Sequence, residues 1–350
     1  MRVGMLAPIS HPFPPGGYGP WERVCHDLTE GLVELGHEVV VYAPEGSTTS
    51  GQLRATVPAP LSDAPPDSLP DARVWEEWHV AMAVQDAVRS DLDVLHSHLH
   101  VHALGFAPLL PMPLVSTLHG SAWHQPHHVM LRAFRQEPFV SLSDSERGFL
   151  PELNYIATVN NGIRTEDFPM GPGGDRLIFV GRMAPEKAPD LAVAVARRTG
   201  RDLLLVGGIE PQYDAYFREE VESKLGGGIE YAGPVTREEV ASLVGESAAL
   251  LMPLRWDEPF GLVVVESLAV GTPVVAWNRG AMPELIDEGI TGFVVEDVDE
   301  GVRAVERVAG LDRKACREVA ERRFSYRVMA QGYVDAYRRA IDDFPADRRR

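Results

Sequence analysis

The feature that most constrains the fold of this chain is an alternation of apolar runs and helical patterns that occurs twice. In the first half, short apolar runs predict buried strands at residues 3–7, 38–42, 92–96 and 114–118. Apolar spacings of three and four predict helices at residues 24–35, which Gly36 ends, and 75–88. In the second half, strand-like runs return at residues 177–180, 202–206, 229–232, 249–252 and 272–276. Strands that alternate with helices are typical of an α/β protein whose parallel sheets are covered by helices.

A segment rich in proline and glycine, residues 169–174, separates the two halves. We therefore expect two Rossmann-like domains, one formed by residues 1–168 and one by residues 169–325. Residues 326–350 are expected to form a C-terminal helix that crosses back to the first domain. In parallel sheets of this kind, ligands bind at the carboxyl ends of the strands, and clefts between domains are common ligand sites.

Three further stretches have patterns of their own. Residues 44–71 are rich in Pro, Ser and Thr and predict an exposed loop. Residues 300–343 are amphipathic and predict helix throughout, broken near Phe324-Ser325. Gly16-Gly17-Tyr18-Gly19 lacks the G-x-G-x-x-G spacing of a dinucleotide fingerprint, which argues against an NAD-dependent dehydrogenase. A mobile glycine loop whose backbone closes over phosphates is the better interpretation.

Charge and composition exclude several function classes. The 350 residues include 33 basic and 51 acidic side chains, for a net charge of −18, and residues 1–160 alone hold 8 Arg, no Lys and 18 acids. Such a surface repels phosphate backbones and anionic lipid, so we expect no nucleic-acid partner and no stable membrane docking. The chain has no apolar run of membrane-spanning length and no signal-peptide pattern. Cys25 and Cys316 match no disulfide or metal spacing, which indicates free thiols and a cytoplasmic protein.

The densest chemistry lies in the second half. Arg182 and Lys187 follow the strand at 177–180, and two such cations in one loop can reach a single phosphate cluster. Phe260-Gly261-Leu262 leads into an apolar helix, whose start offers unpaired N–H groups and the positive end of a dipole. Glu266 lies in that apolar helix, where an unpaired buried carboxylate would be costly, so we expect it to have a hydroxyl partner. The structural alternatives are a solvated ion pair and an ordinary helix start.

In this order and at these spacings, the motifs resemble those of the retaining family 4 glycosyltransferases. The resemblance spans nearly the whole chain, and its further motifs include Gly16-Gly17, Thr117-Leu118-His119-Gly120, Asn160-Asn161-Gly162-Ile163 and Gly280-Ala281-Met282-Pro283-Glu284. It implies the GT-B fold, in which two Rossmann-like parallel-sheet domains face each other across a cleft. It also implies that the acceptor binds to the first domain and the nucleotide-sugar donor to the second.

The resemblance further implies roles for individual residues. It implies donor diphosphate binding by Gly17, Arg182, Lys187, Phe260, Gly261 and Leu262. Glu258 is expected to contact the donor sugar, Glu266 the ribose hydroxyls, and Gly233-Pro234-Val235 the base. His119 ends a strand and is expected to hydrogen-bond the donor sugar, so the catalytic set comprises His119, Arg182, Lys187 and Glu258. The family usually has glycine directly after the lysine, whereas this chain has Ala188-Pro189.

No metal or cofactor is expected. All 12 histidines lie in residues 11–128, and alternation at His96, His98 and His100 superficially suggests metal ligands, as do Asp91 and Asp93. Alternating histidines near a strand end are as readily structural, and the resemblance implies no metal.

The function expected is therefore a retaining, metal-independent hexosyltransferase that uses a front-face mechanism. The donor is a nucleotide-diphosphate sugar, expected to be a UDP-sugar, although the sequence itself does not identify the base. The acceptor is expected to be a small, soluble, uncharged or cationic molecule, whose pocket Trp21, Trp75, Trp78 and Trp123 could shape; core packing is favoured for Trp75 and Trp78. The alternatives are a GT-B-like glycan phosphorylase, which needs a Schiff-base lysine, and a non-catalytic nucleotide-sugar-binding protein.

Overall fold

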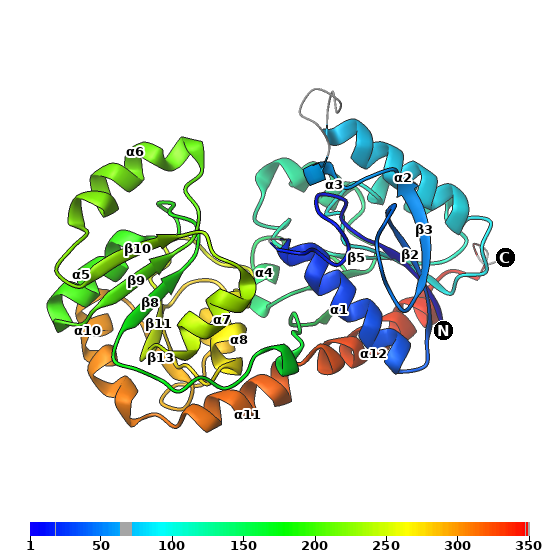
Figure 1. Ribbon diagram of the computed structural model, residues 1–350. Helices are drawn as coiled ribbons and strands as arrows, with labels where there is room; N and C mark the ends of the chain where they lie inside the picture. Colours follow the sequence, from blue (N-terminus) through cyan, green and yellow to red (C-terminus); the bar gives the residue numbers. More distant parts are fainter. Residues whose placement is uncertain (18, 64–71, 347, 349–350) are drawn as a thin grey trace. The chain divides into compact units, whose positions relative to one another are not determined.

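The computed structural model describes residues 1–17, 19–63, 72–346 and 348, and the chain forms two compact units (Figure 1). The first comprises Met1–Ile163 and Tyr326–Arg350, and the second comprises Arg164–Ser325. The predicted boundary at residue 168 therefore lies inside the second unit. The reason is local packing, because Arg317 donates a hydrogen bond to the Phe168 carbonyl and the Arg237 guanidinium lies 4.5 Å from the centre of the Phe168 ring.

The first unit is built on a seven-stranded parallel sheet in the order β3-β2-β1-β4-β5-β6-β7. Its strands are β1 (Arg2–Leu6), β2 (Glu38–Pro44), β3 (Gln52–Val57), β4 (Val94–Ser97), β5 (Leu114–Thr117), β6 (Phe139–Ser141) and β7 (Tyr155–Thr158). The prediction of a loop over residues 44–71 is wrong for β3, because this strand lies at the sheet edge and half of its side chains are exposed. The rest of that prediction includes residues 64–71, which lie outside the described residues.

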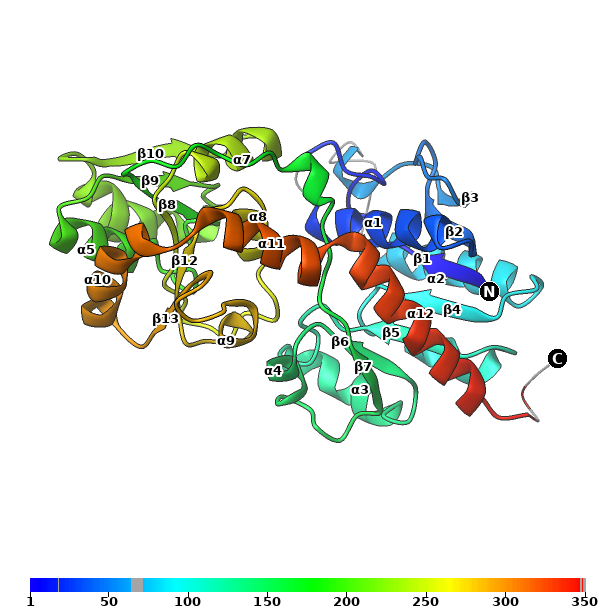
Figure 2. The same cartoon turned by 90° about the horizontal axis from the view of Figure 1, so that it is seen from below.

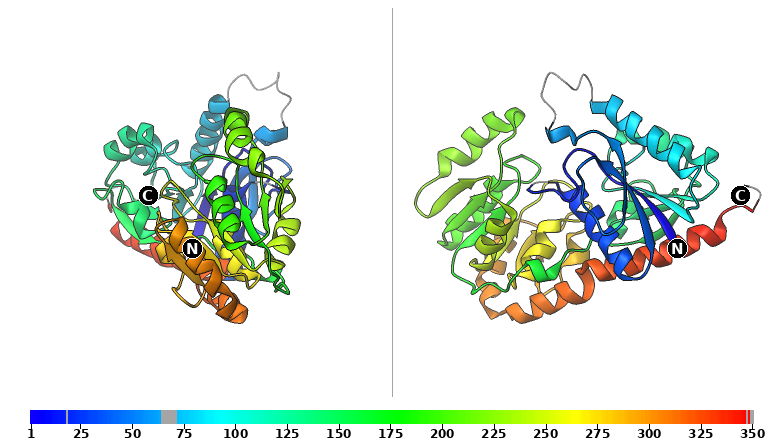
Figure 3. Two further views of the ribbon diagram at one scale, coloured as in Figure 1. Left: turned by 90° about the vertical axis from the view of Figure 1, so that its left-hand side faces the viewer. Right: turned by 45° about the vertical axis from the view of Figure 1, so that its right-hand side comes forward.

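Helices cover both faces of this sheet. They are α1 (Pro20–Glu34), α2 (Ala72–Ala87), α3 (His128–Ala133), α4 (Asp144–Arg147) and α12 (Tyr326–Asp343). Helices α1 and α12 pack against each other on one face, and α2 lies on the opposite face (Figures 2 and 3). Gly31 permits the close approach, since a Cβ there would lie 2.8 Å from the Cβ of Ala330. The C-terminal helix thus completes the first unit.

The second unit contains a six-stranded parallel sheet in the order β10-β9-β8-β11-β12-β13. Its strands are β8 (Leu177–Val180), β9 (Leu203–Val206), β10 (Ile229–Gly233), β11 (Ala249–Met252), β12 (Val274–Trp277) and β13 (Gly292–Val295). Its helices are α5 (Pro189–Thr199), α6 (Asp214–Tyr216), α7 (Arg237–Gly245), α8 (Leu262–Ala269), α9 (Met282–Leu285), α10 (Val298–Arg307) and α11 (Arg313–Phe324). A π-helical turn, Phe217–Val221, continues α6. Helices α5 and α10 pack together, as do α8 and α11 (Figure 2).

The helix predicted over residues 300–343, with a break near Phe324-Ser325, has a second break that was not predicted. A short 3₁₀ turn, Val308–Gly310, ends α10, and Asp312 then caps α11 by accepting a hydrogen bond from the Lys314 N–H. The break near Phe324-Ser325 is present, since α11 ends at Phe324 and α12 begins at Tyr326. Each sheet therefore presents the loops after its strands at one edge, where the predicted site residues lie.

Candidate active site

Three loops of the second unit meet at the carboxyl ends of β8, β9 and β10. Gly181 follows β8 and its N–H donates to the carbonyl of Val206. Gly207 follows β9 with φ at 142°, and a Cβ there would lie 1.9 Å from the Gly181 carbonyl oxygen. Only glycine allows that approach. The Gly207 N–H in turn donates to Gly233 at the end of β10 (2.9 Å), so these residues hold the predicted phosphate loop beside the predicted base pocket.

Arg182 lies in the β8–α5 loop between two carboxylates. Its guanidinium donates to Glu210 (3.0 Å) and to Glu186 (3.1 Å), and the Tyr213 hydroxyl also donates to Glu186 (3.4 Å). Sequence reasoning missed these partners, because Glu210 belongs to a different loop. The ion pairs hold the guanidinium extended, in a partly exposed position from which it can reach an anion.

Lys187 ends the same loop and forms an ion pair with Glu258. Only 17% of the lysine side chain and 14% of the glutamate side chain are exposed. The ammonium also lies 4.8 Å from the centre of the Trp256 ring, which is within cation–π distance. Ala188 follows with φ at 54°. The position where the family usually has glycine is therefore left-handed in this chain too, at a cost of about 1 kcal/mol for alanine.

The loop that carries Glu258 is fixed by a second glycine contact. A Cβ on Gly280, whose φ is 56°, would lie 2.2 Å from the carbonyl oxygen of Glu258 and 2.3 Å from its nitrogen. The Ala281 N–H donates to that carbonyl at 2.8 Å. Glu258 therefore owes its position to the backbone that follows β12, a constraint that the sequence motif at 280–284 does not reveal by itself.

The chain enters α8 through Gly261, which is left-handed with φ at 99°. No side chain of the described residues caps this helix, so its first N–H groups have no side-chain acceptor. Phe260 is buried and its ring packs edge-on against Phe324, so only its backbone is available to a ligand. Leu262 begins the helix. The segment can offer backbone N–H groups to an anion.

Glu266 differs from its sequence-based interpretation. The carboxylate is partly exposed and lies 3.4 Å from the Arg237 guanidinium of α7, so its partner in the fold is a cation. In the fold the Arg237 cation offsets the cost of burying this carboxylate, because the helix turns the side chain toward α7, and the contact with the ribose hydroxyls stays a prediction. Glu266 lies about one turn into α8, which begins at Leu262.

The predicted base pocket follows β10. Gly233 is left-handed with φ at 75°, Pro234 is exposed and Val235 is half-buried. Thr236 then begins α7 with a capping box, in which its side chain accepts from the Glu239 N–H while Glu239 accepts from the Thr236 N–H. The segment presents apolar atoms and a free turn of backbone beside Gly207.

In the first unit, His119 lies just beyond the end of β5. It is 94% buried and left-handed, with φ at 47°, and Gly120 follows with φ at 90°. Its Nε2 lies 2.8 Å from Nδ1 of His98, beyond the end of the adjacent strand β4. Trp21, at the start of α1, lies with its ring centre 6.4 Å from that of His119. Gly17 is exposed, and Tyr18 lies outside the described residues.

A buried carboxylate holds the turn that carries His119. Glu146 accepts hydrogen bonds from the N–H groups of Gly120 (2.5 Å) and Leu142 (2.8 Å). Burial raises the pKa of this carboxyl from 4.5 to about 7, in spite of those two hydrogen bonds. Burial also holds the pKa values of His96, His98 and His119 well below 6.5, so all three imidazoles are neutral.

Other candidate residues have structural roles. His96 bonds Tyr337 (2.7 Å) and Thr117 (2.8 Å), and Asp93 accepts from the Arg2 N–H (2.7 Å). Over the described ranges, no group of three or more His, Cys, Asp or Glu side chains could hold a metal ion. The core-packing prediction is wrong for Trp78, which is 53% exposed, since its indole N–H donates to the Thr56 carbonyl of the edge strand β3.

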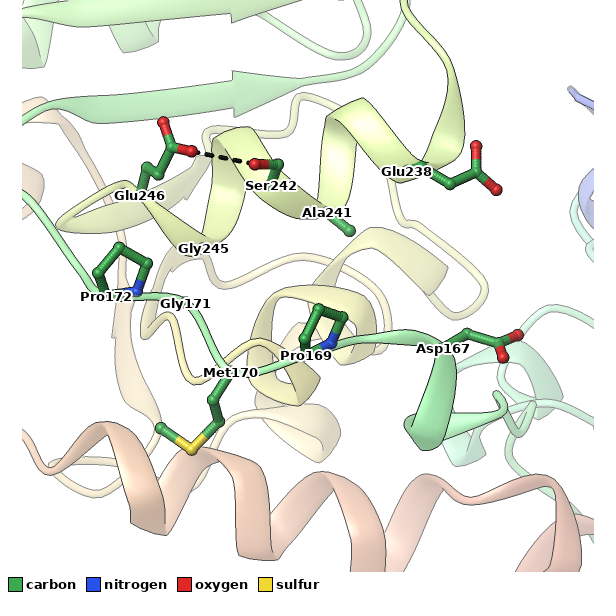
Figure 4. A pocket seen from close by; sticks show the side chains of 10 residues that line it. All are labelled: Asp167, Pro169, Met170, Gly171, Pro172, Glu238, Ala241, Ser242, Gly245 and Glu246. Carbon is green, nitrogen blue, oxygen red and sulfur yellow. Dashed lines mark hydrogen bonds between the residues drawn. The ribbon is translucent and has the colours of Figure 1, made fainter.

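A cavity of about 380 Å³ lies apart from these groups, between α7 and the chain segment that precedes β8 (Figure 4). Its ten lining residues include the carboxylates of Asp167, Glu238 and Glu246. None of the predicted site residues lines it. An acidic lining disfavours a diphosphate, so this cavity is not the donor diphosphate site.

Two family models match most of the chain. A model described as Glycosyltransferase Family 4 matches residues 21–166, and one described as Glycosyl transferases group 1 matches residues 174–310. The glycogen synthase of Mycobacterium tuberculosis (strain CDC 1551 / Oshkosh) is 27% identical over 342 residues, which covers 83% of this chain and 81% of that protein.

Two crystal structures share the fold. AviGT4, a glycosyltransferase involved in avilamycin A biosynthesis, is 25% identical, with a TM-score of 0.72 over 98% of this chain and 99% of that one. Anabaena Alr3699/HepE in complex with UDP and glucose is 17% identical, with a TM-score of 0.70 over 98% and 99% of the two chains. The two parallel-sheet units and these neighbours identify the GT-B fold. In the described part of the chain, no helix has the length and hydropathy needed to cross a membrane.

Proposed function

The chain belongs to glycosyltransferase family 4, and on that premise we propose that it is a retaining hexosyltransferase with a soluble acceptor. The family and the GT-B fold show a glycosyltransferase. The proposal adds retention at the anomeric carbon, a small uncharged or cationic acceptor, a UDP-sugar donor and activity without a metal. The Anabaena neighbour with bound UDP supports the choice of base.

The observation that carries the proposal is the pairing of Lys187 with Glu258 beside the start of α8. Departure of a nucleoside diphosphate builds negative charge, which cations and oriented N–H groups stabilise in a poorly solvated site. Lys187 and Arg182 supply the cations, and residues 260–262 supply backbone N–H groups. When Lys187 turns to the diphosphate, Glu258 is released to accept from hydroxyls of the donor sugar. Carboxylate partners keep both cations extended before a donor binds.

The remaining roles follow the same division. Glu266, with Arg237 beside it, is proposed to accept from the ribose hydroxyls, and Gly233-Pro234-Val235 to contact the base. In the first unit, Gly17 is proposed to contact the diphosphate and His119 to bond the donor sugar. We also propose a front-face mechanism, in which the leaving phosphate helps to deprotonate the acceptor hydroxyl, as the family resemblance implies.

A glycan phosphorylase is disfavoured by the remaining lysines. Lys224 is partly exposed and paired with Glu220 at 2.8 Å, and Lys314 is exposed at the start of α11. A Schiff-base lysine needs a desolvated pocket that lowers its pKa.

The test combines binding with stereochemistry. Purified protein is heated with each of a set of nucleotide-diphosphate sugars, and the stabilising donors are then screened against small sugars and polyols as acceptors. We expect a UDP-sugar to raise Tm and to give a product whose anomeric configuration, by proton NMR, is that of the donor. An inverted product would contradict the retaining mechanism, and stabilisation without any transfer or hydrolysis would favour a non-catalytic binding protein.

A further inference from the structure

The two histidines that follow β4 and β5, His98 and His119, are hydrogen-bonded to each other. The strands run parallel in a register that aligns Ser97 with Ser116, and this brings His98 and His119 together just beyond their ends. Nδ1 of His98 lies 2.8 Å from Nε2 of His119. The side chains are deeply buried, since only 1% of His98 and 6% of His119 is exposed. The contact is therefore a single hydrogen bond shielded from water.

The outer nitrogen of each ring has no partner. Neither Nε2 of His98 nor Nδ1 of His119 makes a hydrogen bond within the described residues. Because both rings are neutral, the pair carries two N–H protons, and one of them lies in the bond between the rings. The other proton therefore belongs to one of the two outer nitrogens, and the direction of the central bond decides which one.

The surroundings of the two outer nitrogens are different. His98 lies in the interior, with its ring centre 4.2 Å from that of His96 and 6.5 Å from that of Tyr333. His119 lies at the carboxyl edge of the sheet, where ligands bind in parallel α/β folds, and next to the exposed Trp21. Both outer nitrogens are buried in this structure. An N–H on His98 Nε2 would stay in the interior without an acceptor, whereas an N–H on His119 Nδ1 lies at the edge of the sheet, where a ligand oxygen can accept from it.

We propose that His98 is a positioning residue, which donates from Nδ1 to Nε2 of His119 and so holds His119 with its proton on Nδ1. His119 then presents a hydrogen-bond donor to an oxygen of the sugar. The proposal rests on the proposed function for the identity of that ligand, but not for the tautomer itself. Glu146 holds the backbone next to His119 by accepting a hydrogen bond from the Gly120 N–H. His96 cannot take the place of His98, since both nitrogens of His96 are bonded to other residues.

Three substitutions of His98 separate this role from simple packing. In His98→Asn the amide lies close to the place of Nδ1, and in His98→Gln it lies close to that of Nε2, while His98→Phe fills the space without a donor. We expect Asn to keep kcat/KM for the donor within about threefold, and Gln and Phe to lose about tenfold, the equivalent of one hydrogen bond. Equal activity of all three variants, with wild-type Tm, would overturn the proposal.

A spectroscopic measurement tests the tautomer without any activity. The protein is labelled with ¹⁵N-histidine, and the His119 signals are assigned by their loss in His119→Asn. We expect a protonated Nδ1 and a bare Nε2 in the wild type, with the proton moving toward Nε2 in His98→Phe. A wild-type His119 protonated on Nε2 would overturn the proposal even if the enzyme transfers sugar. A protonated Nδ1 in a protein that transfers none would support the tautomer and contradict the proposed function.

Discussion

The two units carry different polar groups at the carboxyl ends of similar parallel sheets. In the first unit these are buried imidazoles, which burial keeps neutral, and residues 1–160 contain no lysine. In the second unit they are Arg182 and Lys187, each held by a carboxylate and each within reach of solvent. Neutral donors withdrawn from water suit sugar hydroxyls, and cations suit a diphosphate. The carboxyl ends of the two sheets thus differ in the charge of the groups that they present, neutral imidazoles in the first unit and paired cations in the second.

The largest effect on activity should come from the cations of the second unit. Lys187→Met keeps the aliphatic stem against Trp256 but removes the charge, so we expect turnover to fall at least a hundredfold, or about 3 kcal/mol of transition-state stabilisation. Lys224→Met is the matched control, since that lysine is partly exposed and paired with Glu220. Its activity should stay within twofold. Steady-state kinetics and Tm are measured for both, and a Lys187→Met enzyme with more than a tenth of wild-type turnover would contradict the diphosphate assignment.

In the first unit, the buried carboxyl of Glu146 predicts that stability depends on pH. The pKa of Glu146 rises from 4.5 in the unfolded chain to about 7 in the folded one, so the folded state holds this proton more tightly. Its stabilising contribution is full below pH 4.5 and is lost as the pH rises through 7, a change of about 3 kcal/mol at most. Glu146→Gln cannot titrate. Urea unfolding at pH 5 and pH 8 should therefore show the wild type losing stability relative to the variant at the higher pH, and an unchanged difference would refute this.

A smaller effect should follow from the backbone that supports Glu258. Gly280→Ala places a Cβ against the Glu258 backbone, whereas Gly289→Ala, also at a positive φ of 72°, meets no atom within 4 Å. We expect Gly280→Ala to cost about 2 kcal/mol more in free energy of unfolding than Gly289→Ala, and to lower donor turnover as well. Denaturant titration and kinetics of the two variants measure this difference. Equal values would mean that the loop shifts at no cost.

The smallest expected effect concerns metal. The proposed cations at the diphosphate are the side chains of Arg182 and Lys187 and not a metal ion. Activity in excess chelator should therefore stay within twofold of that of the untreated enzyme. Loss of activity on chelation, with recovery on adding a divalent ion, would contradict the comparison between the units. It would also favour the alternative that the histidines, Asp91 and Asp93 bind a metal ion.

Much of the fold follows from periodicity, and the exceptions have physical reasons. Of the thirteen strands in the described part of the chain, nine coincide with predicted apolar runs, because buried parallel strands are continuous hydrophobic segments. Strand β3 was missed since it is an exposed edge, and β6 since it has three residues. Strands β7 and β13 were missed as well, although other four-residue strands such as β8 and β11 were predicted. Strand β7 differs from those two in that three of its four residues are only partly buried.

The candidate site divides in the same way. Motif spacing indicated Arg182, Lys187 and Glu258, because they lie on loops with a recognisable order. Spacing could not reveal that Glu266 pairs with Arg237 or that His98 bonds His119, since both contacts depend on the packing of separate elements. The alternation His96, His98, His100 was a signal, but strand register alone decides which of these meets His119.

Helix α12 has a consequence for the synthesis of the protein. The second unit is a continuous stretch of chain inserted into the first, and α12 supplies Tyr333 and Tyr337, which bond Thr117 and His96. Thr117 and Tyr333 are 216 residues apart in the sequence, and His96 and Tyr337 are 241 residues apart. Because a ribosome releases the chain from its N-terminus, residues 164–325 can fold before the helix that completes the histidine layer has emerged. The first unit can thus complete its fold only after the second unit has been synthesised, when Tyr333 and Tyr337 become available to Thr117 and His96.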